Sequence, residues 1–262
     1  MSEQTVLSDV DERGIARITL NRPDMQNAMN EVLIGALVEA FERVAADPAV
    51  RVVVLAGNGQ SFCSGGDLNW MRRTAEYGIE ENVADARVLA KMLDSIYRCP
   101  KPVVGLIHGN VYGGGNGLVC AVDIALAAAS TKFCLSEVRL GLMPSTISPY
   151  VVRGMGARAA RRYFLTSELI EPAEAHRLGM IHEVVPDGEL EAAGERIIKT
   201  LLAGGPNAIA ASKVLIERVR YGPVDEAMME YTARGIAEIR ATEEGKEGAD
   251  AFLQKRKPAW RR

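Results

Sequence analysis

The sequence predicts an α/β fold in which most strands pair in parallel. Short apolar runs rich in β-branched residues alternate with segments of helical periodicity, the pattern typical of layered α/β domains. Two glycine-rich segments, residues 61–68 and 113–118, each follow an apolar run and open into a helix-like segment. Glycine lets the backbone approach a ligand closely, and the N–H groups at a helix N-terminus favour negative charge.

The first elements follow from periodicity and turn residues. Ile15–Leu20 alternates and is β-branched, which predicts a strand, and the Asn-Arg-Pro-Asp turn at 21–24 ends it. Apolar residues then recur at helical spacing over Glu31–Ala46. Residues 50–55 form the next predicted strand, which leads into the first glycine-rich segment.

The second half of the chain changes character. A charged helix is predicted for residues 80–97, and the apolar strand 102–107 runs straight into the second glycine-rich segment. Residues 123–129 and 132–135 supply two further strands, whereas only helical patterns occur beyond about residue 187. We therefore expect two units, a main domain at 1–186 and a helical region at 187–262.

The helical region carries more apolar positions than a thin layer of helices needs. They are Ile197, Leu201, Leu202, Ile209, Val214, Leu215, Met228, Met229 and Ile236. Two interpretations remain open, packing against the main domain or contact between subunits.

Composition excludes several classes of protein. The chain has 262 residues, 48% of them hydrophobic, and a formal net charge of -3, which gives no electrostatic footprint for nucleic acid or a membrane surface. The N-terminus lacks the pattern of a signal peptide, and no apolar run reaches the ~18 residues of a membrane helix. Four cysteines and three histidines form no zinc pattern, so we expect no metal. We expect a cytoplasmic protein.

The glycine-rich segments match none of the common phosphate or nucleophile motifs. They lack the lysine of a P-loop, fit a dinucleotide fingerprint poorly, and do not have the spacing of a nucleophile elbow. Two such loops at strand ends can aim two N–H groups at one oxygen, which is an oxyanion hole. The alternative is that the glycines only allow tight helix–strand packing.

The two segments resemble motifs of a known enzyme family. Residues 61–68, Ser-Phe-Cys-Ser-Gly-Gly-Asp-Leu, are similar to FxxGxDL, and residues 109–118 are similar to GxxxGGGxxL. Together with residues 21–23, 27–28 and 136–141, they resemble the enoyl-CoA hydratase/isomerase (crotonase) superfamily over nearly the whole chain.

That resemblance implies a spiral of ββα units followed by a helical region that builds homotrimers or homohexamers. It also implies an acyl-CoA thioester as substrate, with coenzyme A as part of the substrate and no separate cofactor. The oxyanion donors would be the amides of Gly66 and Gly114. The other positions implied to bind substrate are Ser64, Gly65, Asp67, Leu68, Gly115 and Asn116.

The family's hydratases typically carry two glutamates 20 positions apart, and this chain has one of them. Glu137 falls on the second, in a segment similar to FGxPE, whereas position 117, where the first would stand, is a glycine. A buried glutamate beside an acyl chain suits proton transfer. The alternative for Glu137 is a carboxylate that only stabilises a helix N-terminus.

The missing glutamate leaves three functions open. Segments 67–71, 85–91, 133–142 and 147–153 resemble the methylglutaconyl-CoA hydratases of leucine degradation and the isohexenylglutaconyl-CoA hydratases of terpene degradation, which also lack that glutamate. The alternatives are a Δ3-Δ2 enoyl-CoA isomerase and a weakly active acyl-CoA-binding relative. A glutaconyl substrate has a free carboxylate, for which the candidate cations are Arg72, Arg73, Arg87, Lys91 and Arg139.

Overall fold

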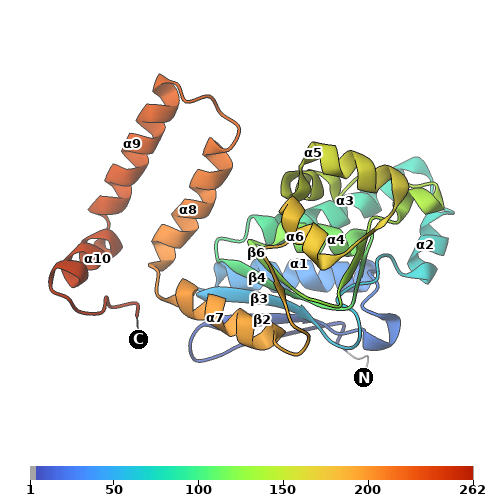
Figure 1. Ribbon diagram of the computed structural model, residues 1–262, viewed down its shortest axis with the longest axis horizontal. Helices are drawn as coiled ribbons and strands as arrows, with labels where there is room; N and C mark the ends of the chain where they lie inside the picture. Colours follow the sequence, from blue (N-terminus) through green and yellow to red (C-terminus); the bar gives the residue numbers. More distant parts are fainter. Residues whose placement is uncertain (1–3, 262) are drawn as a thin grey trace.

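The computed structural model describes residues 4–261 and is built around a six-stranded sheet with helices on both faces (Figure 1). The strand order is β1-β2-β3-β4-β6-β9, and every neighbouring pair is parallel except β1 and β2. The strands are β1 Val6–Val10, β2 Ile15–Leu20, β3 Val52–Gly57, β4 Val103–Ile107, β6 Ile124–Ala128 and β9 Glu183–Val185.

The central strands are apolar on both sides because both faces of the sheet are covered. Along β3, Val53 and Leu55 face one hydrophobic cluster, whereas Val52 and Val54 face a second one. The first cluster lies under α1 Glu31–Ala46, α3 Ile79–Tyr97, α4 Gly114–Ala121 and α5 Ser148–Thr166. The second lies under α7 Leu190–Leu202, on the opposite face.

A second, three-stranded sheet includes the start of the second glycine-rich motif, residues 109–118. It consists of β5 Asn110–Tyr112, β7 Lys132–Cys134 and β8 Leu169–Ile170. The sequence predicted that residues 102–107 would run straight into the glycine loop, but the chain leaves β4 and forms β5 first. Gly109 makes that change of direction with φ +61°, and a Cβ there would lie 1.9 Å from the Gln60 carbonyl oxygen.

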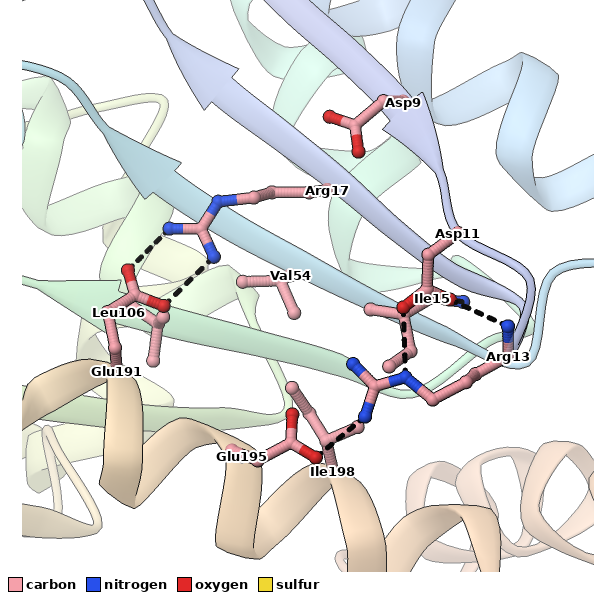
Figure 2. A pocket seen from close by; sticks show the side chains of 10 residues that line it. All are labelled: Asp9, Asp11, Arg13, Ile15, Arg17, Val54, Leu106, Glu191, Glu195 and Ile198. Atoms are coloured by element: carbon pink, nitrogen blue, oxygen red, sulfur yellow. Dashed lines mark hydrogen bonds and ion pairs between the residues drawn. The ribbon is translucent and has the colours of Figure 1, made fainter.

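Ion pairs fix α7 against the strands that it covers (Figure 2). Arg17 pairs with Glu191 through its two terminal guanidinium nitrogens, and Arg13 pairs with Glu195 at 2.7 Å. These side chains rim a cavity of about 150 Å³ whose floor includes Val54. Although α7 follows the predicted boundary at residue 187, it packs on the sheet of the main domain.

The last three helices stand away from the sheet. The hairpin of α8 Pro206–Val219 and α9 Glu226–Ala241 projects from one end of the molecule, followed by α10 Glu243–Leu253 (Figure 1). Met228 is the one buried residue of α9. The large apolar side chains exposed in this region include Val214, Ile216, Val219, Tyr221, Met229, Tyr231, Ile236, Phe252 and Leu253. Within residues 4–261, no helix combines the length and apolarity required to cross a membrane.

Candidate active site

The two glycine-rich segments lie side by side because short stretches of each pair like strands. Cys63 forms a parallel bridge with Val111, and its N–H donates to the Asn110 carbonyl at 3.2 Å. In return, the N–H of Tyr112 donates to the Cys63 carbonyl at 3.0 Å. The residues that follow on each side, Gly65-Gly66 and Gly113-Gly114, are thereby brought together.

The first candidate donor is the amide of Gly66. Met29 pairs opposite Gly66, with its N–H bonded to the Gly65 carbonyl at 2.7 Å and its carbonyl accepting from the Asp67 N–H at 2.8 Å. In a parallel bridge, one residue bonds the two neighbours of the residue opposite, so the Gly66 N–H points away from Met29. Within residues 4–261 that N–H has no hydrogen-bond partner.

The second candidate donor is the amide of Gly114, the first residue of α4. Gly113 precedes it with φ 47° and ψ −120°, and the Gly113 N–H bonds the Cys134 carbonyl at 2.9 Å. Amides in the first helical turn have no partner inside the helix, and the helix dipole favours negative charge there. The Gly114 N–H is likewise unpaired in the described part of the chain.

Glu137 lies beside this turn, at the start of the short helix Glu137–Leu140. A Cβ built on Gly113 would lie 3.5 Å from Oε1 of Glu137 and 3.9 Å from the Cα of Gly65. The other carboxyl oxygen of Glu137, Oε2, is buried and accepts no hydrogen bond from residues 4–261. Burial raises the pKa of Glu137 above its ordinary value of 4.5. A carboxyl group with a raised pKa and one unpaired, buried oxygen next to amide donors suits proton transfer.

The side of α4 that carries Gly117 is filled with hydrocarbon. A Cβ on Gly117 would lie 2.4 Å from Cγ2 of Ile147 and 3.3 Å from Cδ2 of Leu93. Both side chains are buried. Apolar side chains therefore stand where the resemblance would place the first of the two glutamates.

The side chain of Asp67 holds the loop that carries Gly66 in place through a helix cap and an ion pair. Its Oδ1 caps α2 Leu68–Thr74 by accepting from the Asn69 N–H at 2.8 Å, and its Oδ2 pairs with Arg22 at 2.8 Å. Burial alone would raise the pKa of Asp67, but hydrogen bonds from Arg22 and from two amides of α2 bring it below its usual value. The carboxylate is 4% exposed and fully engaged, and the backbone N–H and carbonyl of Asp67 are bonded to Met29 and Met71. Contact of Asp67 with substrate stays a prediction.

Asn116 is fully buried in the first turn of α4. Its side-chain amide nitrogen donates to the carbonyl oxygens of Val111, Gly113 and Cys134, at 3.3, 3.1 and 2.9 Å. The structure thus places Asn116 behind the glycine turn, where it ties α4 to β5 and β7. Gly115 is also buried, and a Cβ there would lie 2.6 Å from the Cys63 carbonyl oxygen.

The remaining predicted binding positions lie on the first loop. Ser64 is half-buried and its N–H bonds the Gln26 carbonyl at 3.0 Å, whereas the side chain of Leu68 is 74% exposed. Contact of these residues with substrate stays a prediction. Sequence reasoning missed Met29 and Ile147, because a single apolar residue carries no signal that it will pack against a catalytic glycine.

A larger cavity of about 450 Å³ lies elsewhere, between α8 and the end of α3. Four of its polar side chains are paired with one another: Lys213 bonds Asp123 at 2.6 Å, and the Tyr97 hydroxyl contacts Glu217. None of the residues Gly66, Gly114 and Glu137 lines it.

Across residues 4–261, no group of three or more His, Cys, Asp or Glu is arranged to hold a metal ion.

The chain is similar to known proteins over nearly its whole length. The family described as enoyl-CoA hydratase/isomerase matches residues 11–262. The crystal structure of an enoyl-CoA hydratase from Shewanella pealeana is similar with a TM-score of 0.95 and 40% identity, covering 98% of this chain and 96% of that one. AtuE of Pseudomonas aeruginosa has a TM-score of 0.94 and 39% identity, covering 98% and 100%. Crotonyl-CoA hydratase of Syntrophomonas wolfei is 30% identical over 260 residues, 98% of either chain.

Proposed function

The chain belongs to the enoyl-CoA hydratase/isomerase family, and from that premise we propose that it adds water reversibly to the 2,3-double bond of an acyl-CoA thioester. One observation carries the proposal. The unpaired amide N–H groups of Gly66 and Gly114 follow directly on Gly65 and Gly113, which lie close together beside Glu137, a carboxyl group with an unpaired buried oxygen. This is the donor set needed to hold an oxyanion and move a proton beside it.

The proposed reaction uses Glu137 twice. As a carboxylate it takes a proton from water while the hydroxyl adds to C3, and the electrons of the double bond move toward the thioester oxygen. The Gly66 and Gly114 amides stabilise the resulting enolate, and each such donor lowers the barrier by about 3–4 kcal/mol in related chemistry. Glu137 then returns the proton to C2, which restores the carboxylate and completes the addition of water.

We further propose a branched glutaconyl-type substrate, 3-methylglutaconyl-CoA or isohexenylglutaconyl-CoA, as the sequence motifs suggest. Its free carboxylate needs a cation, and we choose among the five candidate cations by whether each side chain already has a partner. Arg73 pairs with Glu31, Lys91 with Glu42, and Arg139 donates to the Ser167 carbonyl. The side chains of Arg72 on α2 and Arg87 on α3 have no ion-pair or hydrogen-bond partner among residues 4–261. We assign the substrate carboxylate to one of these two.

A second candidate, double-bond isomerisation, follows from the same single carboxylate. Glu137 would then take a proton from C2 of a 3,4-unsaturated thioester and return it to C4, which leaves a 2,3-double bond with no water added. Incubation of 3-methylglutaconyl-CoA in oxygen-18 water separates the possibilities. Label in a 3-hydroxy product supports hydration, whereas a shifted double bond without label supports isomerisation. Binding of the thioester with neither product supports the weakly active relative and contradicts both reactions.

We also propose that the protein assembles as a homotrimer or homohexamer through the exposed apolar faces of α8, α9 and α10. Exposed apolar surface of this extent commonly marks association. Sedimentation equilibrium distinguishes the two states, and a monomer at micromolar concentration contradicts the assignment. No nucleic acid, membrane or metal partner enters this proposal.

A further inference from the structure

Met29 lies against both candidate oxyanion donors. Its backbone bonds the residues on either side of Gly66, at 2.7 Å to the Gly65 carbonyl and 2.8 Å from the Asp67 N–H. Its side chain lies beside the residue that carries the other donor, because a Cβ built on Gly114 would lie 3.3 Å from the Met29 Sδ and 3.4 Å from its Cε. We propose that Met29 is a positioning residue that sets the spacing between the two amides, a role that rests on the function proposed above.

The Met29 segment is held in place on both sides. The guanidinium of Arg22 donates to the Ala28 carbonyl, one residue before Met29, and pairs with Asp67, one residue after Gly66. Both ends of the Met29–Gly66 pair are therefore tied to one planar group. Met29 is also 1% exposed and belongs to the main hydrophobic cluster, so its side chain has little freedom to move.

The contact with Gly114 has a direct consequence for the donor. Gly114 has no side chain of its own, so the Met29 thioether meets its backbone face. An oxyanion donor works only if it lies about 2.7–3.1 Å from the charged oxygen. Loss of the thioether leaves space beside the N-terminus of α4, and the helix can relax into it, which draws the Gly114 N–H away from the Gly66 N–H.

Kinetics of Met29→Ala and of a matched control test this role. We expect kcat to fall roughly 10- to 100-fold in Met29→Ala while KM changes by less than about threefold, because a displaced donor weakens mainly the transition state. Met155→Ala removes a comparably buried methionine of the same cluster, on α5, and is expected to retain kcat. An equal loss of kcat in both variants assigns the effect to general destabilisation and overturns the proposal.

Raman spectra of a bound enoyl-CoA give a readout that stability does not move. Hydrogen bonds from both amides lower the thioester C=O stretching frequency in the wild-type complex, and we expect a smaller lowering in Met29→Ala. The same frequency in both proteins overturns the role of Met29. A wild-type complex with the frequency of the free thioester contradicts the proposed function itself, so the two failures are distinguishable.

Met29→Leu keeps the proposal testable if the alanine variant does not fold. Leucine conserves volume, which cores tolerate well, but it cannot place an atom where Cε lies. We expect its kcat and its C=O frequency to fall between those of the wild type and Met29→Ala. A leucine variant with wild-type values of both overturns the proposal.

Discussion

Ile147 occupies the space that any side chain on residue 117 would need, since its Cγ2 lies 2.4 Å from a Cβ built on Gly117. Ile147 precedes α5, whereas Gly117 lies in α4, so the contact joins two helices of the site region. Packing therefore leaves room only for glycine at position 117, and the space that a glutamate side chain would need is filled by Ile147. In the proposed function, the acid–base chemistry is left to Glu137.

Gly117→Ala is expected to destabilise the protein, although alanine is the better helix former. The overlap with Ile147 predicts a loss of about 1–3 kcal/mol in the free energy of unfolding, measured in urea. Gly35→Ala in α1 is the matched control, because a Cβ there meets nothing within 4 Å. That variant is expected to gain about 0.5–1 kcal/mol. Combining Gly117→Ala with Ile147→Ala should recover part of the loss, and strict additivity of the two changes contradicts the contact.

Asp67→Asn is expected to cost stability at neutral pH because it leaves the Arg22 guanidinium buried without its counter-charge. Breaking a buried pair costs about 3–5 kcal/mol, whereas an exposed pair contributes at most about 1 kcal/mol. Asp94→Asn, which breaks an exposed pair with Arg98, is the control. The folded-state pKa of Asp67 is lowered, so its contribution is present above pH 3.8 and is lost as pH falls through the lowered pKa. An Asp67→Asn variant as stable as Asp94→Asn contradicts a supporting ion pair.

Glu137 is expected to lower stability at the pH where it works. Burial raises its folded-state pKa, so the folded protein holds this proton more tightly than the unfolded chain does. Its contribution to stability is fully present below pH 4.5 and is lost as pH rises through the raised pKa. Glu137→Gln should therefore unfold at a higher urea concentration than the wild type at pH 7, with the difference shrinking toward pH 4. A less stable glutamine variant at pH 7 contradicts a carboxyl group whose pKa is raised by burial.

Much of the fold is predictable from the sequence because local patterns suffice for it. The strand Ile15–Leu20 and the helix Glu31–Ala46 have the predicted bounds, and the crotonase-type α/β class is confirmed. The edge strands β1 and β9 were missed because neither has the continuous apolar run of a central strand. Strand β5 was missed because it lies inside a segment whose glycines and turn residues predict a loop.

The supporting contacts of the site could not be predicted, because they join residues far apart in the chain. The motifs indicated Gly66, Gly114 and Glu137, and the structure brings these three together. Ile147 opposite Gly117 and Met29 opposite Gly114 depend on how α1, α4 and α5 pack. Contact of Asn116 with substrate stays a prediction: its amide nitrogen bonds three backbone carbonyls, whereas its buried Oδ1 has no partner among residues 4–261.

Turnover and binding by Glu137→Gln test the central claim, that one carboxyl group performs the proton transfer beside two amide donors. Glutamine keeps the shape of the side chain but cannot take a proton from water or return it to C2. We expect kcat with the preferred enoyl-CoA to fall by at least about 10³-fold, while the dissociation constant of the thioester changes by less than about threefold. A glutamine variant with near-normal kcat would show that another group moves the proton, and it would contradict the account.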